Sequence, residues 1–306
     1  MAKKKQDYEI FEIKLVKKQR LSPSFMRLTF GADKVKYLQA YAPDQWVKLI
    51  FPKIAGEGVN VPDDMTPYEY YRSLPEEIRP DIRNYTIRHL RPKVNEVDID
   101  FVLHGAEGPA SAWAIEAEIG AKIFTIAQCE FPDHRAEDTA EIGSFVWSPP
   151  RGAQEILLMA DETALPAAIG ILEQLSALEK PPKVTAYFEV PHEEDCLPTP
   201  IWPGLNLQYL PRNVGTWAAG AQLIAAANSV AIPKLVENAE KQVNDEIPEE
   251  EIVWQRADAA DDSKFYAWIA GETSAMRTIR LTLTKQRGLN KQLLNFMGYW
   301  RKAELH

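Results

Sequence analysis

The sequence predicts a chain of two domains, a small antiparallel β-barrel followed by an α/β domain built on a parallel sheet. Three observations carry this prediction. The chain has 306 residues, which exceeds the usual size of one small domain. Before residue 150, apolar residues alternate in short runs separated by prolines, as in antiparallel strands. After residue 150, strand-like and helix-like segments follow one another in turn, as in a parallel sheet.

The first domain is predicted from short alternating runs at regular spacing, which favour a small barrel. The runs lie at residues 8–16, 25–30, 45–51, 83–91 and 96–104. Pro23, Pro43 and Pro52 break the chain after the first, second and third of these runs. Residues 53–82 are rich in proline and acidic residues and predict a long surface excursion. A helix is expected from Ser111 to Glu118, with Ser111 as its N-cap.

The second domain is predicted from apolar strands that alternate with amphipathic helices. The expected elements are strands at 155–160, 183–190 and 265–270 and helices at 166–178, within 216–241 and at 273–287. Residues 128–144 are acidic and hydrophilic and predict a linker. The boundary is therefore expected near 148–153, which gives domains of residues 1–150 and 151–306.

Composition excludes several classes of protein. The formal net charge of −9 disfavours a nucleic-acid-binding protein. Cys129 and Cys196 lie far apart, which disfavours a disulfide framework and a cysteine-ligated metal site. The basic Lys3–Lys5 run is followed by no apolar core of a signal peptide, and no stretch is long enough to span a membrane. We therefore expect a soluble cytoplasmic protein without a membrane partner.

The most informative stretch is Arg83-Asn84-Tyr85-Thr86-Ile87-Arg88. In an extended strand, Arg83, Tyr85 and Ile87 share one face, and the other three share the opposite face. A planar cofactor that carries phosphates needs a ring to pack on, a hydroxyl for a ring heteroatom and guanidinium groups for phosphate oxygens. This hexapeptide supplies all three kinds of group.

Three further segments follow the pattern of a strand that ends in a loop and opens a helix. The first runs from the strand at 98–104 through Gly105 and Gly108-Pro109-Ala110-Ser111, where helix amides predict an anion site. The second is Met159-Ala160-Asp161-Glu162-Thr163-Ala164-Leu165-Pro166, at the carboxyl end of a parallel strand. The third is Trp268-Ile269-Ala270-Gly271-Glu272-Thr273, and the chain closes with Gly298-Tyr299-Trp300-Arg301.

These segments, taken in order, resemble a known family. The hexapeptide resembles the Arg-x-Tyr-Thr/Ser signature of ferredoxin-reductase-like flavoproteins, and with Arg88 it resembles their siderophore-interacting branch. The other segments resemble that branch's His-Gly, Gly-Pro-Ala-Ser, Gly-Asp-Glu-Thr-Ala-Leu-Pro, Ala-Gly-Glu and Gly-Tyr-Trp-Arg motifs, with Ala160 in place of the usual glycine. The resemblance implies a six-stranded antiparallel FAD-binding β-barrel over residues 1–150 and an NAD(P)H-binding α/β domain with a C-terminal tail over 151–306.

The resemblance also implies an activity, in which NADH or NADPH reduces bound FAD and the flavin reduces a ferric siderophore to release ferrous iron. The implied cofactor-binding residues fall into three groups. Those on the FAD side are Arg83, Tyr85, Thr86, Ile87, Arg88, His104, Gly105, Pro109, Ala110 and Ser111. Those on the nicotinamide side are Asp161, Thr163, Ala164, Gly271 and Glu272, and those in the tail are Tyr299 and Trp300. No catalytic general base and no fixed protein-bound metal are expected.

Ferric siderophores of the catecholate type are strongly anionic, and those of the hydroxamate type are equally bulky. A local cationic pocket would attract such a substrate despite the negative net charge. The candidate substrate-binding residues are Lys48, Arg151 and Arg301, each of which is equally well interpreted as a solvated surface charge.

Two alternatives stay open. In place of a ferric-siderophore reductase, the chain could be a flavin-free siderophore-binding or iron-release protein, or a flavin reductase or electron donor with a different acceptor. The sequence does not specify the siderophore, the role of residues 124–146 or the choice between NADH and NADPH, for which Arg212 is a candidate contact to a 2′-phosphate. We expect a monomer, although no sequence feature fixes the oligomeric state.

Overall fold

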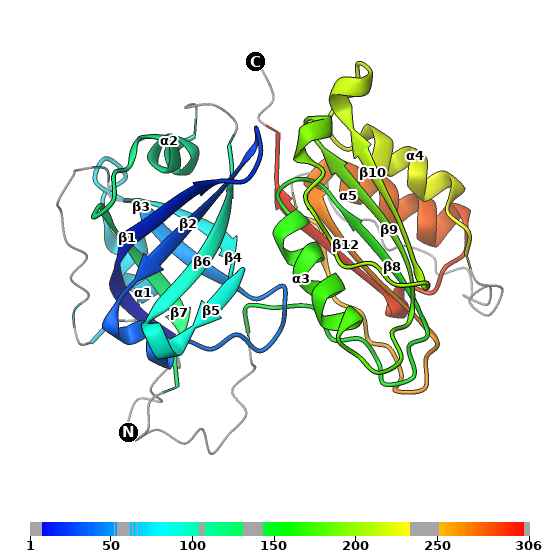
Figure 1. The fold of residues 1–306 in the computed structure, drawn as a ribbon, viewed down its shortest axis with the longest axis horizontal. Helices are drawn as coiled ribbons and strands as arrows, with labels where there is room; N and C mark the ends of the chain where they lie inside the picture. The colour runs from blue at the N-terminus through cyan, green and yellow to red at the C-terminus, as the bar shows by residue number, and fades with distance from the viewer. Residues whose placement is uncertain are drawn as a thin grey trace. The chain divides into compact units, whose positions relative to one another are not determined.

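The fold is described from a computed structural model. The structure describes residues 8–51, 53, 62, 64, 65, 67–103, 108–130, 143–232 and 251–302. The chain divides into two compact units, Met1–Phe145 and Val146–His306. The first unit is a curled antiparallel sheet, and the second is a sheet covered by helices (Figure 1).

The sheet of the first unit has the order β4-β3-β7-β1-β2-β6-β5. Its strands are β1 Tyr8–Arg20, β2 Phe25–Gly31, β3 Trp46–Phe51, β4 Asp81–Thr86, β5 His89–Arg91, β6 Glu96–Val102 and β7 Lys122–Gln128. Its helices are α1 Pro67–Ser73 and α2 Pro109–Glu116, with short 3₁₀ turns η1 Asp33–Tyr37 and η2 Pro92–Val94. Apolar side chains that alternate along the strands, such as Leu15, Leu28, Leu49 and Phe101, are fully buried inside the curl.

The position of β4 and β5 explains why this sheet curls. The two strands form opposite edges of the sheet, yet only Ile87 and Arg88 separate them along the chain. Two intervening residues span about 11 Å at most between the strand ends, so the edges have to approach each other. The Ile87 amide donates to Gln45 O (2.8 Å), just before β3, and the Arg88 amide donates to Asp98 O (2.9 Å), on β6. The connection is therefore hydrogen-bonded to the chain at both sides of the sheet.

The expectation of six strands in the first unit is wrong, because its sheet has seven. The single strand expected at 83–91 divides into β4 and β5, since the chain leaves the edge of β3 after Thr86 and joins the edge of β6 at His89. The helix expected from Ser111 begins instead at Pro109, with Gly108 as its N-cap. Ser111 therefore lies inside the first turn and is not the cap.

The sheet of the second unit has the order β10-β9-β8-β12-β13-β11. Its strands are β8 Glu155–Ala160, β9 Lys183–Val190, β10 Leu205–Pro211, β11 Trp254–Gln255, β12 Phe265–Glu272 and β13 Leu294–Trp300. Its helices are α3 Leu165–Ser176, α4 Ala221–Ser229 and α5 Thr273–Leu281, with short turns η3 Glu193–Asp195, η4 Arg212–Val214, η6 Thr282–Gln286 and η7 Lys291–Leu293. Helices α4 and α5 cover one face of this sheet and α3 the other (Figure 1).

The sheet of the second unit is parallel except at one edge, where β11 pairs antiparallel with β13. From β8 the chain builds β9 and β10 on one side and then β12 and β13 on the other. The order of the strands therefore reverses between β8 and β12, and ligands of open α/β sheets bind at the carboxyl ends of strands at such a point. The closing strand β13 was not expected, because its residues carry no alternation of apolar and polar types.

Candidate functional site

The Arg83–Arg88 hexapeptide presents its groups in different surroundings. The Arg83 side chain is half exposed, and its guanidinium donates to the Ile82 carbonyl (2.8 Å) and lies 3.8 Å from the Asp81 carboxylate. Such a distant carboxylate holds the guanidinium weakly, so Arg83 is accessible to an anion. Thr86 and Ile87 are buried, and Ile87 belongs to the apolar core of the first unit.

The Tyr85 ring lies against the core rather than standing free. It stacks on Phe101 of β6, with 4.2 Å between ring centroids and 28° between planes. Burial raises the pKa of the Tyr85 hydroxyl, against the opposing charge of Arg83, so the phenol stays protonated. Because Tyr85 remains partly accessible, its ring forms a fixed aromatic platform at the edge of the curled sheet.

Arg88 lies in a network of ion pairs on the outer face of β6. Only 7% of its side chain is exposed; the guanidinium hydrogen-bonds to His89 Nε2 (3.1 Å) and lies 3.8 Å from the Asp100 carboxylate. Arg27 donates two hydrogen bonds of 2.7 Å to the same carboxylate. Arg88 is therefore held by protein groups to a greater degree than Arg83.

The second carboxylate of this network, Asp98, accepts hydrogen bonds from Arg91 (2.6 and 2.7 Å) and from Thr29 (2.7 Å) and pairs with His89 (3.2 Å). Burial by itself would raise the pKa of Asp98, but the hydrogen bonds outweigh it and hold the pKa well below its usual range. Glu96 also pairs with Arg91. The network was missed by sequence reasoning, although acidic residues at every second position of a buried strand signal it.

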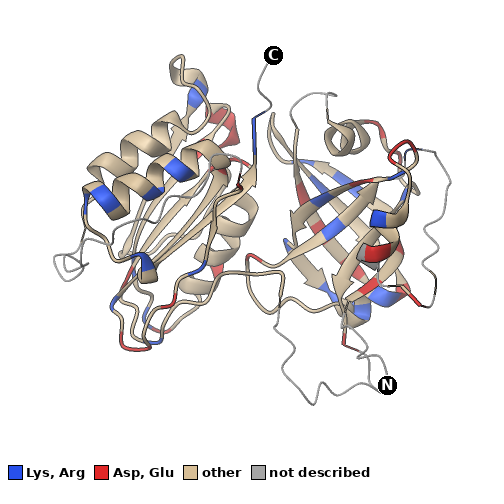
Figure 2. Cartoon of the chain, turned by 180° about the vertical axis from the view of Figure 1, so that it is seen from behind, with Lys and Arg blue, Asp and Glu red and all other residues tan. Residues whose placement is uncertain are grey.

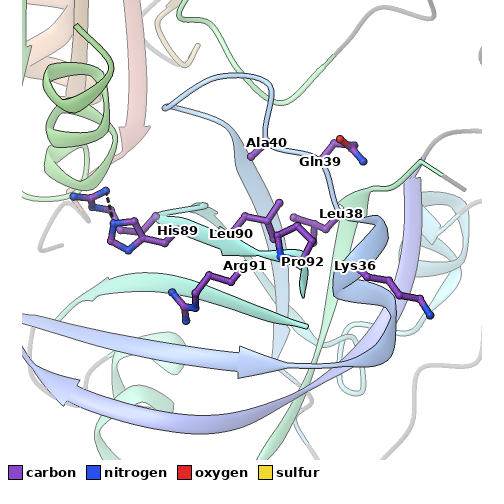
Figure 3. Close-up of a pocket in the computed structure, with 9 residues that line it drawn as sticks. Lys36, Leu38, Gln39, Ala40, His89, Leu90, Arg91 and Pro92 are labelled. Carbon is purple, nitrogen blue, oxygen red and sulfur yellow. Dashed lines mark hydrogen bonds between the residues drawn. The ribbon is translucent and has the colours of Figure 1, made fainter. Parts of the chain in front are cut away.

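A broad open pocket of about 750 Å³ lies beside this network, between β5 and the segment that follows η1. It is lined by Lys36, Leu38, Gln39, Ala40, Arg88, His89, Leu90, Arg91 and Pro92. Figure 3 shows Leu38, Leu90 and Pro92 gathered at its centre, while Lys36 and Arg91 point away from one another at its sides. The pocket thus combines an apolar floor with a cationic margin.

The segment predicted to cradle a pyrophosphate is described only in part. His104 and Gly105 lie outside the described residues. Pro109 occupies the first turn of α2, and Ala110 and Ser111 are buried there. Gly108, the N-cap residue, has no side chain that could accept from the first amides of α2, and the partial positive charge at this end of the helix favours an anion.

In the second unit, Asp161 connects two of the predicted motifs at the carboxyl end of β8. Its Oδ1 accepts hydrogen bonds from the Thr163 amide (2.9 Å), the Thr163 hydroxyl (2.6 Å) and the Ala164 amide (3.3 Å). Its Oδ2 accepts a hydrogen bond from Trp300 Nε1 (2.7 Å). Burial, followed by the charge of Glu162, raises the pKa of Asp161 to about 7. The tail and the Asp-Glu-Thr motif are therefore physically joined.

The Ala-Gly-Glu motif lies at the same point. A Cβ added to Gly271 would lie 2.7 Å from Asp161 Oδ2, so the close packing of the Asp161 side chain on the backbone of β12 requires glycine at this position. Glu272 caps α5 by accepting a hydrogen bond from the Ala275 amide (2.9 Å), and it also accepts one from the Lys302 amide (3.3 Å). The structure thus brings Asp161, Thr163, Ala164, Gly271, Glu272 and Trp300 together where the strand order reverses. Tyr299 is directed differently, with its ring edge-on to Trp268 at 6.4 Å.

Arg212, a candidate contact to the 2′-phosphate of NADPH, is bound to carboxylates of the protein itself. Its guanidinium donates to both carboxylate oxygens of Glu162 (2.7 and 2.8 Å) and to Glu189 (3.0 Å). Glu162 and Glu189 were not predicted as partners, because they lie on separate segments that only the folded sheet brings together.

The three candidate substrate-binding cations differ in their surroundings. Lys48, on β3, donates to Asn84 (3.1 Å), and burial lowers the pKa of its ammonium group. Arg151 is exposed, as is Arg301, whose guanidinium donates to the Glu251 carbonyl (3.4 Å). Figure 2 shows basic and acidic residues interspersed over both units.

No group of three or more His, Cys, Asp or Glu side chains among the residues that the structure describes could hold a metal ion. No helix described by the structure is long and apolar enough to cross a membrane.

Comparison with known proteins identifies the family. Residues 14–128 match the model of the siderophore-interacting FAD-binding domain, and residues 153–303 match that of the siderophore-interacting protein. The chain belongs to the siderophore-interacting protein family. The match of the first unit means that the Tyr85 platform and Arg83 lie within an FAD-binding domain of this family, and the chain is a flavoprotein.

The relatives of this chain include two proteins that are named as reductases. The NADPH-dependent ferric-chelate reductase of Escherichia coli is 31% identical over 60% of this chain and 64% of that protein. The ferric vibriobactin reductase of Vibrio cholerae is 27% identical over 54% of each. Among solved structures, a siderophore utilization protein from T. fusca has a TM-score of 0.69 and 25% identity and covers 97% of this chain and 95% of that one.

A ferredoxin-NADP+ reductase from Plasmodium falciparum has a TM-score of 0.55 and 13% identity, with 94% of this chain and 95% of that one covered. This likeness shows the ferredoxin-reductase-like fold, with a curled antiparallel sheet followed by a mixed sheet. The predicted fold is confirmed at that level, and the number of strands and the purely parallel second sheet are corrected.

Proposed function

We propose that this chain is an FAD-dependent reductase that takes electrons from NADH or NADPH and reduces ferric siderophores, which releases ferrous iron in the cytoplasm. The observation that carries the proposal is the aromatic platform of Tyr85 beside the accessible guanidinium of Arg83, within a domain that matches an FAD-binding model. The names of the two relatives support a ferric complex as acceptor.

The groups present in the first unit fit the chemistry of FAD. Tyr85 offers a fixed ring for the isoalloxazine, and Arg83 offers a guanidinium for phosphate oxygens. The uncapped start of α2 offers amides to a second anionic group. When bound, FAD supplies the chemistry that accepts a hydride and passes electrons on one at a time, so the protein needs only to bind, orient and tune.

The residues of the second unit would hold the nicotinamide nucleotide. Asp161 fixes the loop of Thr163 and Ala164 and the tail at Trp300, and Gly271 lets the Asp161 side chain pack directly against the backbone of β12. These residues lie where the strand order reverses, which is where open α/β sheets bind ligands. Their role is to orient the nucleotide, and no proton transfer by a side chain is needed.

The ferric siderophore is the substrate, and cations would bind its anionic ligand oxygens. Lys48, Arg151 and Arg301 are the proposed contacts. The partly buried ammonium of Lys48 is the strongest of these, because charges screened less by water attract an anion more. Iron would leave the complex after reduction because ferrous iron binds hard oxygen donors more weakly than ferric iron does.

The first experiment asks whether flavin is bound and reducible. The purified protein is expected to be yellow, and anaerobic stopped-flow mixing with NADH or NADPH is expected to bleach its visible bands. Subsequent mixing with a catecholate or hydroxamate ferric complex is expected to restore them. A colourless protein that still binds ferric siderophores would support a flavin-free carrier instead. Reoxidation by free flavin or a protein acceptor, but by no ferric complex, would support a different acceptor.

Replacement of Arg83 tests the proposed contact between its guanidinium and an FAD phosphate. The Arg83→Gln variant is expected to weaken FAD binding about tenfold, because a charge-assisted hydrogen bond to phosphate is lost. Fluorescence titration of the apoprotein with FAD measures this, with the exposed Arg72→Gln as matched control. Equal affinities of the two variants would remove Arg83 from the flavin site.

Charge reversal of Lys48 tests the substrate contact. The Lys48→Glu variant is expected to raise KM for a catecholate ferric complex about tenfold, since an attraction becomes a repulsion. Lys17→Glu, at an exposed position of β1, is the matched control. An unchanged KM in the Lys48 variant would remove this residue from the substrate site. The cytoplasmic location and the monomeric state stay predictions.

A further inference from the structure

The choice between NADH and NADPH depends on the groups around the 2′ position of the nucleotide's adenosine ribose. NADPH carries a phosphate dianion there, whereas NADH carries a hydroxyl. Enzymes with open α/β sheets bind that phosphate through an arginine and bind the hydroxyl through a carboxylate. The groups at the carboxyl ends of β8, β9 and β10 therefore decide which nucleotide fits.

Arg212, which follows β10, is the one cation available at these strand ends. It is the only lysine or arginine in the segments 161–164, 191–204 and 212–220, all of which the structure describes. Its guanidinium is committed to protein carboxylates through a bidentate pair with Glu162 and a further hydrogen bond to Glu189. Burial by itself would lower the pKa of Arg212, but these ion pairs outweigh it and raise that pKa.

The two carboxylates cannot readily release Arg212. The exposed fractions of the Glu162 and Glu189 side chains are 2% and 0%. Glu189 also accepts hydrogen bonds from the amides of Gly220 (2.6 Å), Gln222 (3.0 Å) and Leu223 (3.2 Å) at the start of α4. Turning the guanidinium toward a ligand would leave Glu162 buried and uncompensated, which is strongly unfavourable.

The net charge of this cluster of Arg212, Glu162 and Glu189 is −1. The loop after β9 adds further negative charge through the exposed residues Glu193 and Glu194. Asp195 comes next and is fully buried, with its carboxylate accepting a hydrogen bond from the His192 amide (3.1 Å). Burial, followed by the charges of these three acidic residues, raises the pKa of the nearby Cys196 thiol. The charges on the segments that follow β8, β9 and β10 are therefore predominantly negative, which opposes a dianion there.

We propose that the buried cluster of Arg212, Glu162 and Glu189 excludes a 2′-phosphate from the carboxyl edge of the second sheet, so that the chain uses NADH in preference to NADPH. This inference rests on the proposed function, because it assumes that the edge binds a nicotinamide nucleotide. Arg212 acts here as a specificity-determining residue whose charge is already neutralised. The 2′-hydroxyl of NADH carries no charge, so it meets no such repulsion.

A binding experiment tests the inference without any redox turnover. Adenosine 5′-monophosphate and adenosine 2′,5′-bisphosphate differ only by the 2′-phosphate, and calorimetric titration of the purified flavoprotein measures the affinity of each. The monophosphate is expected to bind at least about tenfold more tightly. The difference is expected to shrink as the salt concentration rises, because the repulsion is electrostatic. Equal or tighter binding of the bisphosphate, or no binding of either, would overturn the inference.

A variant and a kinetic comparison complete the test. Glu162→Gln makes the cluster neutral and is expected to reduce the preference for the monophosphate over the bisphosphate several-fold. Lys180→Gln removes the charge of an exposed residue after α3 and is expected to leave that preference unchanged. An unaltered preference in a folded Glu162→Gln protein would contradict the role of the cluster. NADH is expected to reduce the bound flavin with a kcat/KM at least about tenfold above that of NADPH. Reduction by neither nucleotide would refute the proposed function, whereas faster reduction by NADPH would refute only this inference.

Discussion

Two networks of ion pairs, one in each unit, combine arginine with acidic residues but differ in their balance of charge. On the outer face of β6, Arg27, Arg88 and Arg91 meet Asp98, Asp100 and Glu96, so positive and negative charges are equal. At the carboxyl edge of the second sheet, Arg212 alone meets Glu162 and Glu189. The first network is neutral overall, while the second leaves a net negative charge.

The type of a residue therefore does not by itself define what the residue binds. Arg83 and Arg212 have the same side chain, yet the first has a carboxylate at 3.8 Å and the second has contacts of 2.7–3.0 Å with two carboxylates. An arginine already paired in this way adds little attraction for a ligand phosphate. The balance of charges around each guanidinium decides what it can bind.

The largest expected effect follows from removal of Glu189. Glu189→Leu should lower the free energy of unfolding by about 3–5 kcal/mol, because Arg212 and the amides at the start of α4 lose their buried partner. Urea denaturation followed by circular dichroism measures the loss, with the exposed Glu194→Leu as control. A loss similar to that of the control would mean that the second network does not stabilise the edge.

A smaller loss of stability is expected where the Asp161 side chain packs against the backbone of Gly271. Gly271→Ala should cost about 2 kcal/mol, since the new Cβ would lie 2.7 Å from an Asp161 oxygen that is fixed by its hydrogen bonds. The matched change Gly108→Ala, where a Cβ meets nothing within 4 Å, should cost little. Thermal denaturation of both variants compares them, and equal Tm values would contradict the close approach.

The smallest expected effect lies in the balanced network of the first unit. Asp98→Asn should cost about 1–2 kcal/mol at pH 7, because Arg91 is partly exposed and water compensates for the lost charge. The pKa of Asp98 is depressed in the folded state, so its stabilisation is present above the unfolded pKa of about 4 and is lost as the pH falls below it. Wild type and variant should therefore converge between about pH 4 and pH 2.

Glu96→Gln is the control for this pH dependence, since Glu96 pairs with the same arginine but has 37% of its side chain exposed. Its cost should stay below about 0.5 kcal/mol. If the difference between wild type and Asp98→Asn were independent of pH, the depressed pKa would not be the source of the stabilisation.

Much of the fold was predictable because local patterns agree with it. The apolar-rich segments expected as strands became β8, β9 and β12, and Pro166 lies in the first turn of α3, close to where the helix was expected to begin. The strand at 83–91 was not predictable as two strands, because nothing in its alternation records that the chain changes edges after Thr86. The closing strand β13 and its antiparallel partner β11 likewise depend on pairing that short segments do not encode.

The candidate site divides in the same way. The Asp-Glu-Thr, Ala-Gly-Glu and C-terminal segments were each recognisable, and the structure adds that Asp161 joins all three through Gly271 and Trp300. The partners of Arg212 were not recognisable, because Glu162 and Glu189 lie far from it along the chain. Long-range ion pairs leave no periodic signal in a sequence.

The sequence alone was enough to predict the two-part architecture, the family and the order of the candidate cofactor motifs, since these depend on periodicity and on residues adjacent in the chain. The tertiary structure alone decided which guanidinium groups are accessible and which are neutralised. Electrostatic energy depends on distance and burial, and both are properties of the folded chain rather than of its order.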